Sequence, residues 1–207
     1  NGFTKTGYTF VGWATTSEGA VAYDNTASYT MGTASVTLYA KWAINTFTLT
    51  STAGAHGSIV GSSLQTVDYN ASGSLVTATP AAGYHFVNWS DGVLTASRTD
   101  ANVQSRISAT ATFAINMYTL AASNGANGSV TPAGVATKDY GSSQTYTIAP
   151  VANYHVLDVL VDSLSVGAIT SYTFTNVTAA HTISASFAID TYILTVNSTG
   201  AGSGSVG

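Results

Sequence analysis

Apolar and polar residues alternate one by one along three stretches of the chain. In residues 107–115 the odd positions are Ile, Ala, Ala, Phe and Ile, and Ser, Thr or Ala fills the positions between them. Residues 36–42 and 182–189 repeat this pattern. Because side chains two apart share one face of a strand, each stretch is predicted to be a strand with an apolar face toward a core and a Ser/Thr face toward water.

Helical spacing is not sustained anywhere, and turn-forming residues separate the predicted strands. Residues 53–57, 124–128 and 199–204 are rich in Gly and predict hairpin loops. Two further segments, Asn70–Leu75 and Gly141–Gln144, would suit a short helix or a turn. The sequence therefore predicts a mainly β fold.

One stretch, Gly83–Trp89, recurs in whole or in part at residues 7–13 and 153–159. Asn153 stands where the other two copies have Gly, which predicts a positive φ at this position, because Asn is the residue that tolerates it next best. The aromatic residues on the apolar faces are expected in the core: Trp13, Trp42, Trp89, Phe113 and Phe187. Phe113→Ala is expected to cost about 3–5 kcal/mol of stability.

The predicted strands belong to an internal repeat. Phe47, Tyr118 and Tyr192 begin three similar strands, with offsets of 118 − 47 = 71 and 192 − 118 = 74 residues. The Gly-Ser-aliphatic triplets at 57–59, 128–130 and 204–206 recur at a spacing similar to that of these strands. The predicted units are residues 1–45, the later part of a repeat; 46–116 and 117–190, two complete repeats; and 191–207, the opening of another.

The junctions between repeats contain no linker. From each closing aromatic to the next opening aromatic is five residues, as from Trp42 to Phe47 and from Phe113 to Tyr118. Without a Gly/Ser or Pro linker, neighbouring units are expected to touch and to form an extended, semi-rigid array. The centroids of residues 46–116 and 117–190 are expected roughly 30–40 Å apart, from the size of a 72-residue domain.

Composition narrows the possible functions. Only 7% of the residues are charged, the net charge is −4 and Cys is absent. The five cations are scattered, so that no basic patch for nucleic acid can be proposed, and they are Lys5, Lys41, Arg98, Arg106 and Lys138. Neither a signal peptide nor an apolar run of membrane-spanning length occurs in the sequence.

Several side chains are candidates for a site, and a structural role is preferred for each. His85 and His155 would be metal ligands, but no second spaced ligand accompanies either one. Four carboxylates would suit calcium but lack a binding-loop pattern, and they are Asp91, Asp100, Asp158 and Asp162. A triad of Ser90, His85 and Asp91 lacks a nucleophile setting, so that no catalytic, cofactor or metal site is predicted.

Aromatic and asparagine side chains are weaker candidates, for sugar binding and for glycosylation respectively. Tyr39, Trp89 and Tyr172 could stack on sugar rings if they are exposed, although a place in the core is preferred for aromatics on the apolar faces. Glycosylation sequons, which matter only in a glycosylating host, begin at Asn70, Asn88, Asn127, Asn176 and Asn197.

Residues 5–13, Lys-Thr-Gly-Tyr-Thr-Phe-Val-Gly-Trp, followed by Thr-Leu-Tyr-Ala-Lys-Trp at 37–42, resemble the second half of a Listeria–Bacteroides repeat, the B-repeat of internalin-type surface proteins. Residues 46–116 and 117–190 are similar to divergent B-repeats, although Val159 replaces the Trp in the later one. The resemblance implies a small β-grasp-like module in secreted or wall-attached bacterial proteins, and it carries no catalytic residues.

The function expected from these observations is an extracellular structural array that serves as a stalk, spacer or fibre-forming segment. The alternative is a carbohydrate- or host-binding adhesin module whose repeats supply avidity. Expected partners are neighbouring repeats, other copies of the chain, or a glycan or cell-surface ligand. Head-to-tail assembly is one hypothesis, in which strand Tyr192–Val196 of one copy pairs with residues 1–42 of another.

Overall fold

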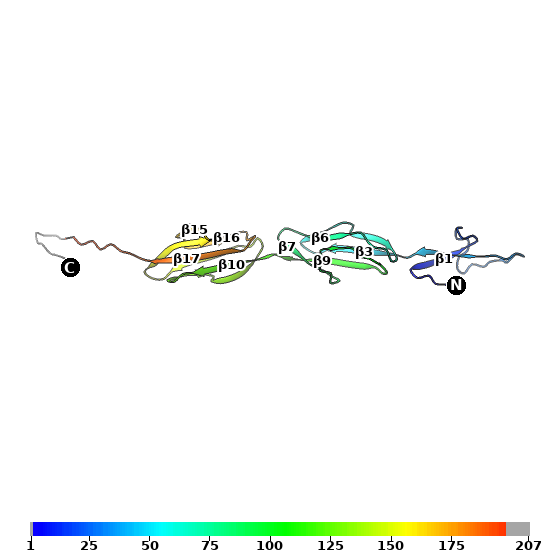
Figure 1. The fold of residues 1–207 in the computed structure, drawn as a ribbon, viewed down its shortest axis with the longest axis horizontal. Coiled ribbons are helices and arrows are strands. Elements are labelled where there is room, and N and C mark those ends of the chain that lie inside the picture. Colours follow the sequence, from blue (N-terminus) through cyan, green and yellow to red (C-terminus); the bar gives the residue numbers. More distant parts are fainter. Residues whose placement is uncertain (1, 198–207) are drawn as a thin grey trace. The chain divides into compact units, whose positions relative to one another are not determined.

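The computed structural model describes residues 2–197, which divide into two compact units that meet in sequence between Asn116 and Met117. The first unit holds β1 (Tyr8–Ala14), β2 (Tyr39–Ile44), β3 (Thr46–Ala53), β4 (Gly57–Val60), β5 (Leu64–Asp68), β6 (Val76–Pro80), β7 (Tyr84–Trp89), β8 (Ser97–Arg98) and β9 (Ile107–Ile115). The second holds β10 (Met117–Asn124), β11 (Gly128–Thr131), β12 (Gly134–Asp139), β13 (Gln144–Pro150), β14 (Tyr154–Val161), β15 (Leu164–Gly167), β16 (Ser171–Phe174) and β17 (His181–Ile189). The described residues are all-β, as predicted, and contain no helix (Figure 1).

The first unit begins with a small two-stranded sheet. β1 and β2 pair antiparallel, with Tyr8 opposite Ile44 and a bulge between Phe10 and Gly12. Phe10 packs edge-on against both Trp13 and Trp42, with ring centroids 5.1 and 5.4 Å apart. Aromatic contacts therefore take the place of a two-sheet core in this segment.

Residues Thr46–Asn116 form the first complete module. Its larger sheet has the order β5-β3-β9-β7, and its smaller sheet has the order β4-β6-β8. β3 and β9, the first and last strands, pair in parallel from Leu49 opposite Ile107 to Ala53 opposite Ala111. All other strand pairs of the module are antiparallel.

Residues Met117–Asp190 repeat this plan as the second module. The larger sheet has the order β12-β10-β17-β14-β15, and the smaller sheet has the order β11-β13-β16. β10 and β17 form the parallel pair, from Leu120 opposite His181 to Asn124 opposite Ala185. β15, which pairs with an extension of β14 at Val159–Val161, is the strand without a counterpart in the first module.

In each module the core lies between the two sheets. In the first, Trp89 is completely buried among Val76, Ala78, Ala109 and Ala111. In the second, the buried side chains come from both sheets and include Leu120, Tyr146, Ile148, Val159 and Ile183. Of the aromatics expected in the core, only Trp89 is fully buried, and four are partly buried: Trp13, Trp42, Phe113 and Phe187. Phe113 and Phe187 pack against their cores, so that the predicted faces of β9 and β17 are confirmed.

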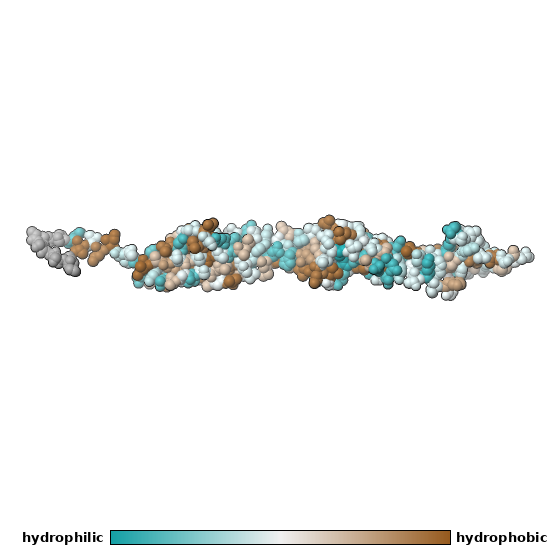
Figure 2. All heavy atoms as spheres, in the orientation of Figure 1, coloured by the Kyte–Doolittle hydropathy of each residue, from teal (hydrophilic) through white to brown (hydrophobic). Residues whose placement is uncertain are grey.

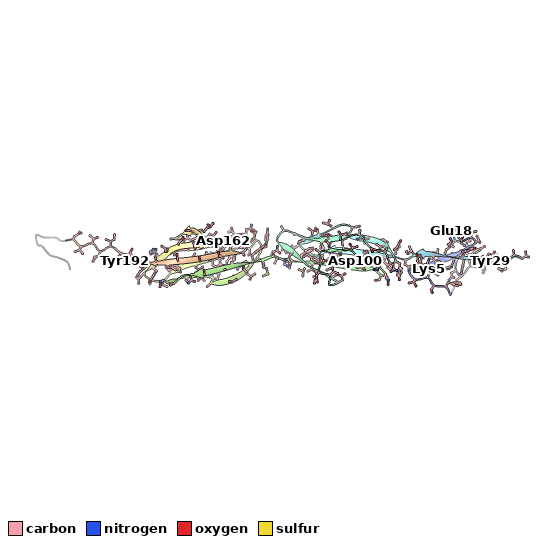
Figure 3. The ribbon with its side chains drawn as sticks, in the orientation of Figure 1. Lys5, Glu18, Tyr29, Asp100, Asp162 and Tyr192 are labelled. Atoms are coloured by element: carbon pink, nitrogen blue, oxygen red, sulfur yellow. The ribbon has the colours of Figure 1, made fainter. Side chains whose placement is uncertain are left out.

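Of the two alternatives predicted for Asn70–Leu75 and Gly141–Gln144, the turn is found, because bonds such as Ala71 N–H to Asp68 O (2.9 Å) close a single turn only. Other local predictions differ from or lie outside the structure. The strand predicted from Val36 begins at Tyr39, where pairing with β1 starts. Tyr192–Val196 forms no strand, since no described strand pairs with it, and Ile193 is 94% exposed (Tyr192 is labelled in Figure 3). The loop at 199–204 and the triplet at 204–206 lie outside the described residues.

Turns occur in the two described Gly-rich segments, 53–57 and 124–128, but the prediction that they are hairpin loops is wrong. Each segment crosses from the larger to the smaller sheet, because β3 and β4, like β10 and β11, lie in different sheets and do not pair with each other. The Gly-Ser-aliphatic triplets at 57–59 and 128–130 begin β4 and β11. Asn153 has a φ of 67°, close to the 81° of Gly83 and the 79° of Gly7. The β-grasp description of the module stays a prediction, because a second sheet, rather than a helix, covers the larger sheet in the described residues.

Candidate functional site: the junctions between repeats

The residue that follows the closing strand of each repeat is hydrogen-bonded to that same repeat. Its backbone N–H donates to the carbonyl oxygen of the left-handed residue that precedes β1, β7 or β14. The three bonds are Asn45 to Gly7 (2.9 Å), Asn116 to Gly83 (2.8 Å) and Asp190 to Asn153 (2.9 Å). A positive φ at the acceptor residue therefore recurs where the junction is fixed, which explains why Gly or Asn stands there.

A side-chain bond reinforces each backbone bond. The junction residue accepts a hydrogen bond from the second residue of β1, β7 or β14 through Oδ1. The donors are Thr9 Oγ1 to Asn45 (2.6 Å), His85 Nδ1 to Asn116 (2.8 Å) and His155 Nδ1 to Asp190 (2.9 Å). We refer to the two bonds at each of Asn45, Asn116 and Asp190 as the junction bracket.

The junction bracket gives His85 and His155 a structural role. The Nδ1 atom of each imidazole is hydrogen-bonded to the junction residue. The side chain of His155 is about half exposed, at 54%. No group of three or more His, Cys, Asp or Glu side chains that could hold a metal ion occurs within residues 2–197. Sequence reasoning missed the bracket, although its signal, Asn or Asp three residues after each closing aromatic, is visible in the repeat.

Asp91 and Asp100, weighed as calcium ligands, both bind Arg98. Arg98 is 7% exposed, and its guanidinium donates to Asp91 at 2.8 and 3.1 Å and to Asp100 at 2.6 Å. It also lies over the Trp89 ring, 5.0 Å from the centroid. The hydrogen bond from Arg98 lowers the pKa of Asp91 below its usual value. These carboxylates therefore neutralise a buried cation.

Asp158 and Asp162 are also engaged with protein donors. Asp158 accepts from Ser165 Oγ at 2.6 Å. Asp162, labelled in Figure 3, accepts from His181 Nδ1 at 2.7 Å and from the backbone N–H of Thr182 at 2.8 Å. The bond from His181 lowers the pKa of Asp162, with that from Thr182 adding to it. The Asp158 carboxylate thus links β14 to β15, and the Asp162 carboxylate links the turn between these strands to β17.

The structure does not bring Ser90, His85 and Asp91 together. Ser90 Oγ accepts the backbone N–H of Thr110 at 3.0 Å, while the other two bind Asn116 and Arg98. Residues 2–197 enclose no pocket. The arrangement thus supports hydrogen bonding within the module and not the triad.

The three aromatics weighed for sugar binding lie in different surroundings. Trp89 is buried and donates its Nε1–H to Thr95 O at 3.0 Å, so it cannot stack on an external ligand. Tyr172 is partly buried against the core of the second module, and Tyr39 is 40% exposed. On the face drawn in Figure 2, most surface residues are near neutral in hydropathy, and strongly hydrophobic or hydrophilic residues form small groups.

Four of the five sequons lie in turns or at exposed ends. Asn70, Asn127 and Asn176 are exposed with positive φ, Asn197 is exposed, and Asn88 is partly buried on β7. Asn70 accepts a bond from Gln104 Nε2 at 2.8 Å.

The two complete modules match one known family. Residues 47–117 and 118–191 each match the divergent InlB B-repeat domain. The chain belongs to this repeat family. Residues 1–41 of this B-repeat chain match the Listeria-Bacteroides repeat domain. No curated protein and no solved structure matches the chain.

Repeats of both families are typical of extracellular or surface proteins, and they are in general not catalytic. The B-repeat chain is accordingly a repeat-containing protein of the structural or surface class. No described helix is long and apolar enough to cross a membrane.

Proposed function

We propose that this B-repeat chain is an extracellular spacer or stalk without enzymatic activity, in a bacterial surface or secreted protein. The observation that carries the proposal is the shortness of the junctions. Asn45 alone separates β2 from β3, and Asn116 alone separates β9 from β10. Because the junction bracket fixes each of these residues to the module before it, the chain has little freedom to hinge there.

Small-angle scattering of the whole chain tests the spacer function. The sequence predicts centroids of residues 46–116 and 117–190 roughly 30–40 Å apart, as for successive domains of this size. The double variant H85A/N116A removes the side chains of one bracket and is expected to broaden the distribution of distances. Thr66→Ala, on the exposed edge strand β5, serves as the control and should leave the distribution unchanged. A compact scattering profile for the parent chain would refute the spacer.

Ligand binding is the alternative function, and one exposed aromatic on β2, Tyr39, favours it. A glycan array probed with the whole chain and with Tyr39→Ala decides between the two functions. Specific binding that is lost in the variant would support an adhesin module, whereas no binding above background would leave the spacer.

Head-to-tail assembly, finally, would join Tyr192–Val196 of one copy to the unpaired edge of β2 in another. Three apolar side chains of this segment are more than 80% exposed: Tyr192 (84%), Ile193 (94%) and Leu194 (88%). Light scattering at high concentration, with and without residues 191–207, tests the assembly. Equal monomer masses would exclude it.

A further inference from the structure

We propose that each complete module resists tension applied between its two ends, and that the parallel ladder between its first and last strands supplies this resistance. The ladders are β3–β9 in the first module and β10–β17 in the second. The inference deepens the proposed spacer function and rests on it for its biological meaning.

The direction of the strands sets how the ladder is loaded. The chain enters the first module through β3 and leaves it through β9, and the two strands run parallel. The start of β3 and the end of β9 therefore lie at opposite ends of the ladder. A force that separates them must slide one strand along the other, so that the hydrogen bonds of all five registered pairs are loaded together.

An antiparallel hairpin responds differently to a force applied between its ends. Its two free ends lie side by side, so that a force between them opens one hydrogen-bonded pair at a time. In both modules the antiparallel pairs lie outside this path, since β5 and β7 flank the central ladder β3–β9, and β12 and β14 flank β10–β17.

The ladder residues are also shielded from water. In the first module Leu49 is 3% exposed, Ala109 1% and Ala111 0%, and these side chains face the smaller sheet. In the second module Leu120 and Ile183 are buried to a similar degree. Because water cannot readily replace a strained bond in such surroundings, the ladder is expected to yield as a whole.

A hydroxyl pair adds a link on the outer face of the first ladder. Thr52 Oγ1 and Thr110 Oγ1 lie 2.7 Å apart across β3 and β9, at residues that are register partners. The junction bracket then continues the path, because it ties the residue that leaves β9 or β17 back to β7 or β14.

Force spectroscopy with introduced cysteine handles tests the proposal, because the parent sequence has no Cys. In the whole chain, Met117→Cys with Thr191→Cys pulls the second module at opposite ends of the ladder. Met117→Cys with Ala180→Cys pulls the same module at one end, since Ala180 immediately precedes β17. All three positions are exposed. The first pair is expected to rupture at a several-fold higher force.

Both variants should keep the thermal midpoint of the parent, so that a difference in force reports geometry and not stability. If a handle destabilises the second module, the first module offers an equivalent comparison, Thr46→Cys with Met117→Cys against Thr46→Cys with Arg106→Cys. Equal rupture forces in the two geometries, or a higher force when both handles lie at one end, would overturn the proposal. Neither result alters the scattering measurement, which tests the spacer function separately.

Discussion

At the scale of single residues, the ring of the aromatic that closes each module leaves room only for glycine at the start of β4 or β11. A Cβ at Gly128 would lie 2.2 Å from Phe187 Cζ, and one at Gly57 would lie 2.2 Å from Phe113 Cε2. These distances are far below van der Waals contact. The Gly-Ser-aliphatic triplet and the closing Phe, which are separate landmarks in the sequence, are therefore one packing unit.

Gly128→Ala is expected to destabilise the second module by about 1–3 kcal/mol, as for other overpacked cores. Gly125→Ala is the matched control in the same loop, because its Cβ would meet nothing closer than 3.6 Å. The control should change stability by less than about 0.5 kcal/mol. Denaturant unfolding of both variants checks the prediction, and equal costs would contradict it.

Tyr146 carries a polar atom that the core does not satisfy. Its side chain is completely buried, its hydroxyl has no hydrogen-bond partner, and burial raises the pKa of the phenol. The ring packs edge-on against Phe174, with centroids 6.0 Å apart. The aromatic body thus contributes to the core while the hydroxyl costs stability.

Tyr146→Phe is therefore expected to leave the second module unchanged or to stabilise it by about 1–2 kcal/mol, since only the unpartnered hydroxyl is lost. Tyr146→Ala should cost about 3–5 kcal/mol, because it opens a cavity. Thermal unfolding distinguishes the two variants. A loss of stability in Tyr146→Phe would show that the hydroxyl has a partner.

At the scale of elements, the two modules fill equivalent positions of their cores with different side chains. Arg98 lies opposite Val76 in the β6–β8 pair, and Tyr172 lies opposite Tyr146 in the equivalent β13–β16 pair. The first module thus fills this part of its core with Trp89 and a neutralised cation, whereas the second uses aromatic rings beside the smaller Val159. Such an exchange is physically reasonable, because apolar residues of suitable volume can replace a buried ion pair.

Acid is expected to destabilise the first module through the loop between β7 and β8. The pKa of Asp91 in the folded protein is lowered below 3.8 by the bond from Arg98. The charged form therefore stabilises the fold above that value, and this contribution is lost as the pH falls through the lowered pKa. Asp91→Asn should flatten this part of the pH dependence.

Thermal midpoints measured between about pH 6 and pH 3 check this prediction, since that range spans the ordinary pKa of Asp. Asp162→Asn is the companion variant, because Asp162 has a lowered pKa in the second unit. Each variant should change only its own unit's transition. An unaltered slope in Asp91→Asn would mean that Asp91 does not contribute.

At the scale of the whole molecule, the two units have separate cores. The buried clusters around Trp89 and around Leu120 share no residue, and the boundary lies between Asn116 and Met117. Calorimetry is expected to resolve two transitions, and Gly128→Ala should lower only one of them. A single transition that shifts as a whole would show that the units unfold together.

The sequence by itself determined the β class, the repeat and the alternating strands that close each module. Alternation over 107–115 identified the buried face of β9, because the period of two is a local property of extended backbone. The exchange of Gly for Asn at 153 identified a positive φ for a similar local reason. The repeat likewise indicated the family before any fold was known.

Only the tertiary structure decided which residues meet. The parallel pairing of β3 with β9 joins residues 58 positions apart, as in Leu49 and Ile107, and alternation is the same for a parallel and an antiparallel neighbour. The partner of His85 depends on another long-range pairing, that of β7 with β9, which places Asn116 beside β7. Arg98 is buried where β8 pairs with β6. Hydrogen bonds between side chains act over about 3 Å, so long-range register, which no local pattern encodes, fixes them.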